Sequence, residues 1–167
     1  MLDGVRATRM QQLYEQFAPR TGRLAYLLIG DRDAAEDITQ EAFVRAFGRL
    51  PLLRNPDAFG SYVRTTVVNL TRKHWRKTSV QKSYLARERA LLVPRHHELP
   101  DVPAHHDVIN ALRALPHDQR AALVLRFFED LSERDAAAVL GCRPGTVKSR
   151  VSRGLETLRI DMRGDET

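Results

Sequence analysis

The sequence predicts an all-α protein made of two small helical domains joined by a flexible linker, the second domain being a helix-turn-helix. Apolar residues recur at three- and four-residue spacing through most of the 167 residues, which is the period of one helix face. The period is lost over residues 78–106, where prolines and two histidine pairs give the composition of a linker. We therefore expect domains at residues 1–77 and 107–167.

The N-terminal domain should contain three helices. The first, from residue 10 to residue 28, is expected to be kinked or split at Pro19, because proline lacks an amide hydrogen and clashes with the preceding turn. The second should span roughly residues 33–49, after an aspartate that can cap it. The third should span about residues 56–77, with Asn55 able to cap it. Its β-branched cluster at residues 65–68 would also suit a strand, so the helix prediction there rests on periodicity.

The C-terminal domain should begin with a short helix that a proline stops after residue 115, followed by a helix-turn-helix. Ser132 and Asp135 are spaced as a capping box that opens the first helix of this motif. Gly141 supplies the positive φ of a tight turn, and Pro144 suits the first position of the second helix. Small apolar residues in the first helix would let the second approach closely.

The second helix of the motif carries hydroxyl groups and cations on one side and apolar residues on the other. Residues 143–159 contain five basic residues and one acidic residue. Short hydroxyl side chains beside cations suit the phosphates and base edges of a major groove. A helical hairpin with a solvated basic face is the alternative, but the glycine turn and the small inner residues favour DNA binding. The residues predicted to contact DNA are Thr146, Lys148, Ser149, Arg150, Ser152 and Arg153.

Two helices of the N-terminal half carry opposite charge. Residues 31–41 hold five acids and one arginine, so this face should point away from DNA phosphates. It is either a solvated face, with its acids stabilised near a helix N-terminus, or a docking face for a basic protein partner. Residues 62–77 hold cations and aromatic rings without an acid, as a binder of unpaired bases requires. The alternative for Tyr62 and Trp75 is a place in the core.

Composition excludes several classes of protein. The formal charge of +6 and the pI near 10.0 favour nucleic acid as a partner. The longest strongly apolar run is too short to span a membrane, and no secretory signal pattern is present, so we expect a cytoplasmic protein without membrane insertion. A single cysteine, Cys142, excludes an internal disulfide and a cysteine-based zinc site. Histidine pairs in a proline-broken segment do not fix a metal geometry. We expect no catalytic residue, metal or cofactor, and hence no enzyme.

The order of these segments resembles that of an extracytoplasmic-function sigma factor of bacterial RNA polymerase, of the sigma-70 family and its SigE-like subgroup. The resemblance rests on GDRDAAEDITQEAFVRAFGRL, FGSYVRTTVVNLTRKHWRK and LPHDQRAALVLRFFEDLSERDAAAVLGCRPGTVKSRVSRGLETLR. It covers about residues 10–77 and 107–160. It implies a factor that binds core polymerase, recognises promoter DNA and helps to melt it. The alternative is a stand-alone helix-turn-helix regulator that binds duplex DNA as a dimer.

The resemblance also implies partners and site residues. Asp37, Gln40 and Glu41 correspond to the helix that docks on the polymerase β′ subunit. The residues that the resemblance implies for contact with the minus-ten element are Arg54, Asn55, Arg64, Asn69, Arg72, Lys73, Arg76 and Lys77. The second helix of the helix-turn-helix, with the six polar residues named above, corresponds to the reader of the minus-thirty-five element. The implied partners are core RNA polymerase through its β and β′ subunits, promoter DNA and a possible anti-sigma factor.

Three positions depart from the family pattern. Arg143 stands where a serine N-cap is common, and Tyr62 where tryptophan is frequent. Gly154 lies inside the recognition helix, where glycine costs up to about 1 kcal/mol relative to alanine. These departures bear on promoter preference rather than on the family.

Overall fold

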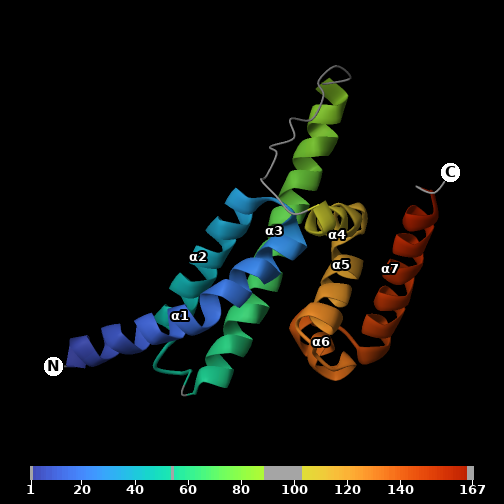
Figure 1. Cartoon of the computed structure of the whole chain (residues 1–167). Helices are drawn as coiled ribbons and strands as arrows, with labels where there is room; N and C mark the ends of the chain where they lie inside the picture. Colours follow the sequence, from blue (N-terminus) through green and yellow to red (C-terminus); the bar gives the residue numbers. More distant parts are fainter. Residues whose placement is uncertain (1, 54, 89–102, 165–167) are drawn as a thin grey trace.

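The computed structural model describes residues 2–53, 55–88 and 103–164, and every regular element in these ranges is a helix (Figure 1). This confirms the all-α prediction. The elements in chain order are α1 (Leu2–Ile29), α2 (Arg32–Gly48), α3 (Pro56–Glu88), α4 (Pro103–Ala114), α5 (His117–Leu123), the π-helical turn η1 (Val124–Phe128), α6 (Glu133–Leu140) and α7 (Pro144–Gly164). No helix in the described ranges is both long and apolar enough to cross a bilayer.

Helices α1, α2 and α3 pack around a cluster of phenylalanines. Phe59 of α3 is fully buried, and its ring centroid lies 6.1 Å from that of Phe43 and 5.6 Å from that of Phe47, both on α2. Phe17 of α1 completes the cluster at 5.7 Å from Phe59. Tilted and stacked aromatic pairs at these separations add to the stabilisation from area burial. The apolar residues that recur with helical spacing in the sequence therefore form a core between α1, α2 and α3.

Helix α1 runs without a break across Pro19, so the expected split of this helix does not occur. Proline removes the hydrogen bond to the carbonyl four residues earlier, which belongs to Glu15. Both residues are exposed, so water can satisfy that carbonyl. Leu24 and Leu28, beyond the proline, are buried and hold the second part of α1 against the core.

Side-chain caps fix the starts of α2 and α3 as the sequence indicates. The Asp31 carboxylate accepts the amide of Ala34 at 2.8 Å, and the Asn55 side-chain oxygen accepts the amide of Ala58 at 2.7 Å. The β-branched cluster of α3 is helical, with Val67 and Val68 both fully buried. Adjacent helical positions point about 100° apart, so burial of both means that α3 is covered on more than one side.

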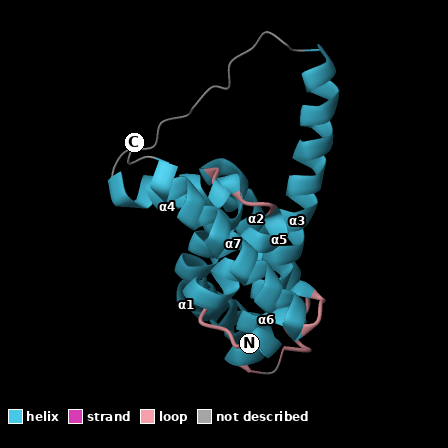
Figure 2. Ribbon diagram, turned by 90° about the vertical axis from the view of Figure 1, so that its right-hand side faces the viewer, coloured by secondary structure: helices cyan, strands magenta, loops and turns pink. Residues whose placement is uncertain are grey.

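Helix α3 continues to Glu88, past the expected end of the N-terminal domain at residue 77. Its last part projects beyond the rest of the protein in both views (Figures 1 and 2). Helix α4 begins at Pro103, inside the segment expected to be a linker. The rest of that segment, residues 89–102, lies outside the described residues.

The C-terminal helix-turn-helix has the predicted local structure. The Ser132 hydroxyl accepts the amide of Asp135 at 3.0 Å, and Gly141 has a φ of 65° in the turn between α6 and α7. Gly154 has a packing role that the sequence did not reveal. A Cβ at this position would lie 2.8 Å from Cδ1 of Leu123, so glycine permits the close approach of α7 to α5. The helix-propensity cost of glycine is thereby offset by packing.

The two halves of the chain pack against each other rather than lying apart on a tether. Helices α1 and α3 contact α4, α5, η1 and α6 of the C-terminal half, and the buried residues of both halves form one continuous cluster. The Arg120 guanidinium joins them, since it is buried and donates to the carbonyl of Leu28 at 2.6 Å. It also donates to the carbonyls of Arg113 at 3.0 Å and Leu115 at 3.1 Å. These oxygens lie at or just beyond the C-terminal ends of α1 and α4, where the helix dipole favours a cation.

Candidate nucleic-acid and protein interfaces

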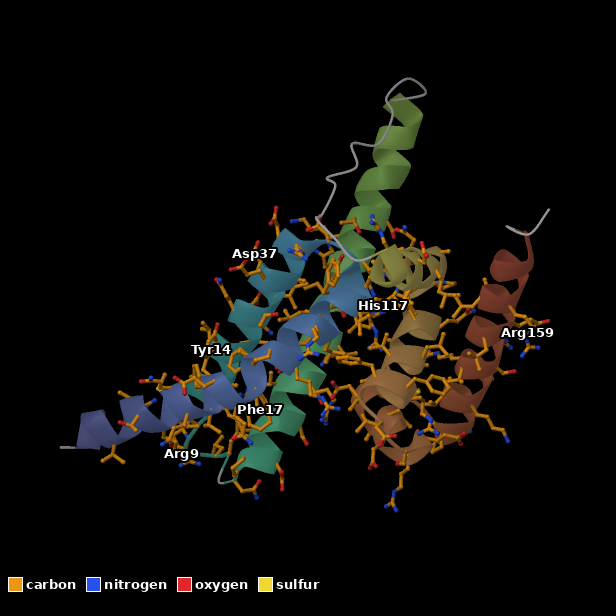
Figure 3. The ribbon with its side chains drawn as sticks, in the orientation of Figure 1. Arg9, Tyr14, Phe17, Asp37, His117 and Arg159 are labelled. Carbon is orange, nitrogen blue, oxygen red and sulfur yellow. The ribbon has the colours of Figure 1, made fainter. Side chains whose placement is uncertain are left out.

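The predicted docking residues lie together on the outer face of α2. Asp37, Gln40 and Glu41 are all exposed, and Figure 3 shows Asp37 pointing away from the body of the protein. Gln40 donates to the Glu36 carboxylate at 3.4 Å, and Glu41 pairs with Arg45 on the same helix. Figure 1 places α2 on the opposite side from α5 and α7. This acidic face is therefore open to a partner.

A groove that no sequence pattern predicted lies beside Asp37, Gln40 and Glu41. It lies between α1 and α2, has a volume of about 380 Å³, and is lined by Tyr14, Tyr26, Arg32, Glu36 and Gln40 among others. Tyr14 is 46% exposed although its ring lies 4.9 Å from that of Phe43. Its helical spacing indicated a core position, and no signal in the sequence distinguished it from the buried Leu13 beside it.

Six of the eight predicted minus-ten residues lie on α3, and these six fall into two groups. Asn69, Lys73, Arg76 and Lys77 are exposed, while Asn55 uses its side-chain oxygen as a helix cap. Arg54 lies outside the described residues. The remaining two, Arg64 and Arg72, turn toward the C-terminal half, with side chains only 23% and 22% exposed. The structure thus does not display the seven described residues of this set on one open surface.

Arg64 and Arg72 contact carboxylates of the C-terminal half. Arg64 Nε donates to Glu129 Oε2 at 2.6 Å, and Arg20 Nε donates to Glu129 Oε1 at 3.0 Å. Arg72 Nε lies 3.6 Å from Asp118 Oδ1. No pattern in the sequence predicts a role for Asp118 or Glu129, because the residues next to an acid do not indicate which distant cation will pair with it.

The predicted minus-thirty-five residues lie on the first half of α7. Lys148, Ser152 and Arg153 are exposed, and Thr146 and Ser149 are half-buried with the Ser149 hydroxyl donating to the Thr146 carbonyl at 3.0 Å. Farther along α7, Arg159 points outward (Figure 3). Arg150 is the exception, because its Nη2 donates to Asp118 Oδ2 at 2.7 Å and its side chain is 23% exposed.

A hollow of about 380 Å³ lies where α3 meets α5 and the turn between α6 and α7. It is lined by Arg72, Trp75, Arg76, Pro116, His117, Asp118, Leu140, Gly141, Cys142 and Arg150. Three of these are cations and one is a carboxylate. The Trp75 side chain lies outside the core, since it is 40% exposed, and its ring lies 6.3 Å from that of His117.

His117 is buried in the wall of this hollow and is neutral at pH 7. The Thr71 hydroxyl lies 2.9 Å from the Val68 carbonyl and 3.1 Å from His117 Nε2, with which it forms a hydrogen bond. Burial lowers the pKa of His117 to about 4; the Asp118 carboxylate opposes this shift, and the charges of Arg120 and Arg72 add to it. No hydrogen-bond partner of His117 Nδ1 is found among the described residues.

Comparison with known proteins accounts for both halves of the chain. Residues 13–80 match the family "Sigma-70 region 2", and residues 105–158 match "Sigma-70, region 4". The sequence is 35% identical over 153 residues to the ECF RNA polymerase sigma factor SigE of Mycolicibacterium smegmatis, covering 89% of this chain and 59% of that protein. It is 33% identical over 142 residues to the RNA polymerase sigma-H factor of Pseudomonas aeruginosa, covering 78% of this chain and 74% of that protein.

The fold is similar to that of a solved complex. The sigma factor RpoE from Bartonella quintana, crystallised with the anti-sigma factor NepR, superposes with a TM-score of 0.73 at 27% sequence identity. The match covers 92% of this chain and 96% of the RpoE chain. Both halves of this chain therefore have counterparts in one known sigma-factor structure.

Proposed function

This chain belongs to the sigma-70 family, in its extracytoplasmic-function branch, and we propose that it directs core RNA polymerase to the promoters of a specific set of genes. The observation that carries the proposal is that regions 2 and 4 occur in family order and are both helical, with an acidic face on α2 and basic faces on α3 and α7. A stand-alone regulator would need neither region 2 nor the acidic face. Sigma factors initiate transcription without being enzymes, and in this proposal the chemistry belongs to the polymerase.

The outer face of α2 is the proposed docking surface for core polymerase. Asp37, Gln40 and Glu41 are exposed, negative or polar, and remote from the basic helix α7. A partner surface rich in Lys or Arg would find complementary charge there without competing with DNA. Recognition of the minus-ten and minus-thirty-five elements is assigned to α3 and to α7, and tethering of these two weak contacts raises their joint affinity through effective concentration.

The experiment that tests this function is retention of the protein by purified bacterial core RNA polymerase. The double reversal Asp37→Lys with Glu41→Lys should abolish retention while the helix content stays that of the wild type. A matched control, Asp107→Lys with Glu156→Lys, makes the same charge change at exposed positions of the C-terminal half and should be retained normally. A folded wild-type protein that core polymerase does not retain would refute the proposal.

Control by an anti-sigma factor is the second part of the proposal. The Bartonella quintana protein with the similar fold was crystallised with such a factor. The exposed acidic face on α2 and the exposed cations on α3 are surfaces that an inhibitor of that class would need to cover. Co-purification of a small partner protein from the native cell, released on induction of the regulon, is the expected result.

A further inference from the structure

We propose that the hollow where α3 meets α5 and the turn between α6 and α7 is a binding site for a free mononucleotide, a molecule that joins a planar base to a phosphate. The volume of the hollow, about 380 Å³, lies at the lower end of the roughly 300–1,000 Å³ that is typical of small-molecule pockets. That size suits one nucleotide better than a longer strand. The inference concerns the free protein and depends on neither polymerase nor promoter DNA.

The lining of the hollow carries an excess of positive charge. Arg72 and Arg76 of α3 and Arg150 of α7 contribute three guanidinium groups, whereas Asp118 is the one acid among the described residues of the lining. His117 is neutral at pH 7 and adds no charge. A phosphate monoester carries about −1.5 to −2 charges at pH 7. It would therefore neutralise the charge that Asp118 leaves over.

The guanidinium groups retain hydrogen-bond donors for a phosphate. Arg150 directs one N–H to Asp118 at 2.7 Å and another to the sulfur of Cys142 at 3.8 Å. Arg72 directs one N–H to the Leu140 carbonyl at 3.3 Å, and its Nε lies 3.6 Å from Asp118. A guanidinium has five N–H donors, so most donors of both groups are not engaged by these contacts. The planar fork of arginine matches the oxygens of a phosphate.

Trp75 gives the site an aromatic surface for the base. It is the only tryptophan of the chain, its side chain is 40% exposed, and it lies in the same lining as Arg72 and Arg76. Stacking of a base on an aromatic side chain changes affinity by roughly fivefold to more than a hundredfold. An aromatic ring beside cations therefore favours a nucleotide over a simple anion.

One polar atom in the wall of the hollow has no hydrogen-bond partner among the described residues. His117 is 3% exposed, and its Nδ1 lies 3.8 Å from Asp118 Oδ1, which is beyond hydrogen-bond distance. Buried polar atoms are nearly always satisfied, so this atom indicates a place for a further polar group. A ribose hydroxyl or a base nitrogen that enters beside Asp118 would provide that group.

The test titrates the full chain with AMP, GMP, CMP and UMP in turn. Binding is followed by the fluorescence of Trp75, with N-acetyltryptophanamide as the control for light absorption by the bases, and by calorimetry. The corresponding nucleosides and inorganic phosphate are titrated separately. The expected result is saturable binding of at least one mononucleotide, at least about tenfold tighter than its nucleoside or inorganic phosphate, because each of these lacks one of the two contacts.

Two variants of equal net charge locate the site. Arg76→Gln removes an exposed cation of the lining, whereas the control Arg159→Gln removes an outward-pointing cation of α7 that is not part of it (Figure 3). Arg76→Gln should weaken mononucleotide binding about tenfold, and the control by less than about twofold. Trp75→Leu, followed by calorimetry, should weaken mononucleotide binding but leave the affinity for inorganic phosphate unchanged.

Four outcomes would overturn the proposal. The first is the absence of saturable binding with all four nucleotides in the millimolar range. The second is inorganic phosphate that binds as tightly as the nucleotides, which would indicate a site for simple anions. The third is a single-stranded tetranucleotide that binds more tightly than the free nucleotide, which would assign the lining to a nucleic-acid strand. Equal weakening by Arg76→Gln and Arg159→Gln, the fourth, would place the nucleotide elsewhere. Failure of the sigma-factor function shows separately, as a wild-type protein that core polymerase does not retain.

Discussion

The outer face of α2 and the interface between the two halves both carry paired charges, but the pairs differ in kind. Glu41 and Arg45 lie four residues apart on one helix, with side chains about half exposed at 50% and 49%. Glu129 is 2% exposed and its partners, Arg20 and Arg64, lie 109 and 65 positions away in the chain. An exposed pair of the first kind contributes roughly 0.3–0.5 kcal/mol, whereas loss of one member of a buried pair costs about 3–5 kcal/mol.

The difference shows which charges are available to partners. Groups on α2 are solvated and exchange water for a partner at little cost. In the interface Glu129 is buried and the Arg64 side chain is only 23% exposed, so a partner that binds Arg64 must first displace the opposite half. The protein thus presents one exposed acidic face on α2 and one set of cations that are paired in the interface between the halves.

The largest expected effect is the difference between truncating Glu129, in the interface, and truncating Glu41, on the outer face of α2. Glu129→Ala should lower the free energy of unfolding by about 1–3 kcal/mol, because Arg20 and Arg64 each lose a charge-assisted hydrogen bond while Arg20, whose side chain is 55% exposed, remains solvated. Glu41→Ala should lower it by less than about 0.5 kcal/mol. Urea unfolding followed by circular dichroism measures both. Equal losses for the two variants would mean that the ion pairs of Glu129 contribute no more to stability than the exposed pair on α2.

The second prediction compares two glycines of α7, of which Gly154 packs against α5 and Gly145 has no neighbour within 4 Å of a Cβ. A Cβ at Gly154 would meet Leu123, which is buried, whereas nothing lies within 4 Å of a Cβ at Gly145. Gly154→Ala should therefore cost about 1–2 kcal/mol through overpacking. Gly145→Ala should leave stability unchanged or raise it by up to about 1 kcal/mol through helix propensity. Thermal unfolding of the two variants gives the comparison, and a stabilised Gly154→Ala protein would contradict the close approach of α7 to α5.

The third effect is a pH dependence confined to the interface. Burial holds the pKa of His117 near 4, against 6.5 for an ordinary histidine, so the docked arrangement binds fewer protons than the separated one. Its stabilisation is complete above pH 6.5 and falls as the pH drops toward 4, by roughly 1 kcal/mol per pH unit. The charged groups facing His117 are Asp118, Arg120, Arg72, Arg76 and Arg150.

Acrylamide quenching of Trp75 between pH 7.5 and about 5.5, a range in which ordinary carboxyl groups stay ionised, measures this dependence. Quenching should rise on acidification in the wild type. His117→Gln keeps a hydrogen-bond partner for Thr71 and should remove the rise. A pH response that survives in His117→Gln would assign the titration to another histidine.

Local features of the fold were predictable and long-range ones were not. The caps at Asp31, Asn55 and Ser132 and the turn at Gly141 depend on residues within a few positions, and all have the expected geometry. Helix α1 is not split at Pro19. The exposure that lets it continue depends on tertiary packing, which the sequence near the proline does not indicate.

The predicted site residues divide in the same way. The spacing of Asp37, Gln40 and Glu41 on one helix determines that they share a face, and the structure shows that face exposed. The spacing of Arg64 and Arg72 predicts a common helix but not what covers it. Their partners Glu129 and Asp118 come from another part of the chain. Only the docking of the two halves brings these pairs together.

The smallest effect separates two arginines of α7 that the sequence treats alike. Arg153 is exposed, while Arg150 is paired with Asp118. In the free protein, Arg153→Ala should weaken binding to a mixed-sequence duplex by less than about fivefold, the scale of one exposed charge contact, and lower the salt dependence by about one ion. Arg150→Ala should not weaken it, because the docked protein does not offer that guanidinium to DNA.

If core polymerase separates the two halves, the comparison reverses. In holoenzyme both substitutions should weaken binding to promoter DNA upstream of the minus-ten element, and to a similar degree, because Arg150 is then released from Asp118. Fluorescence anisotropy with and without core polymerase measures the four affinities. An equal loss of duplex affinity for both variants in the free protein would mean that Arg150 reaches DNA without separation of the halves. The distinction between exposed charges and charges paired in the interface would then not apply to α7.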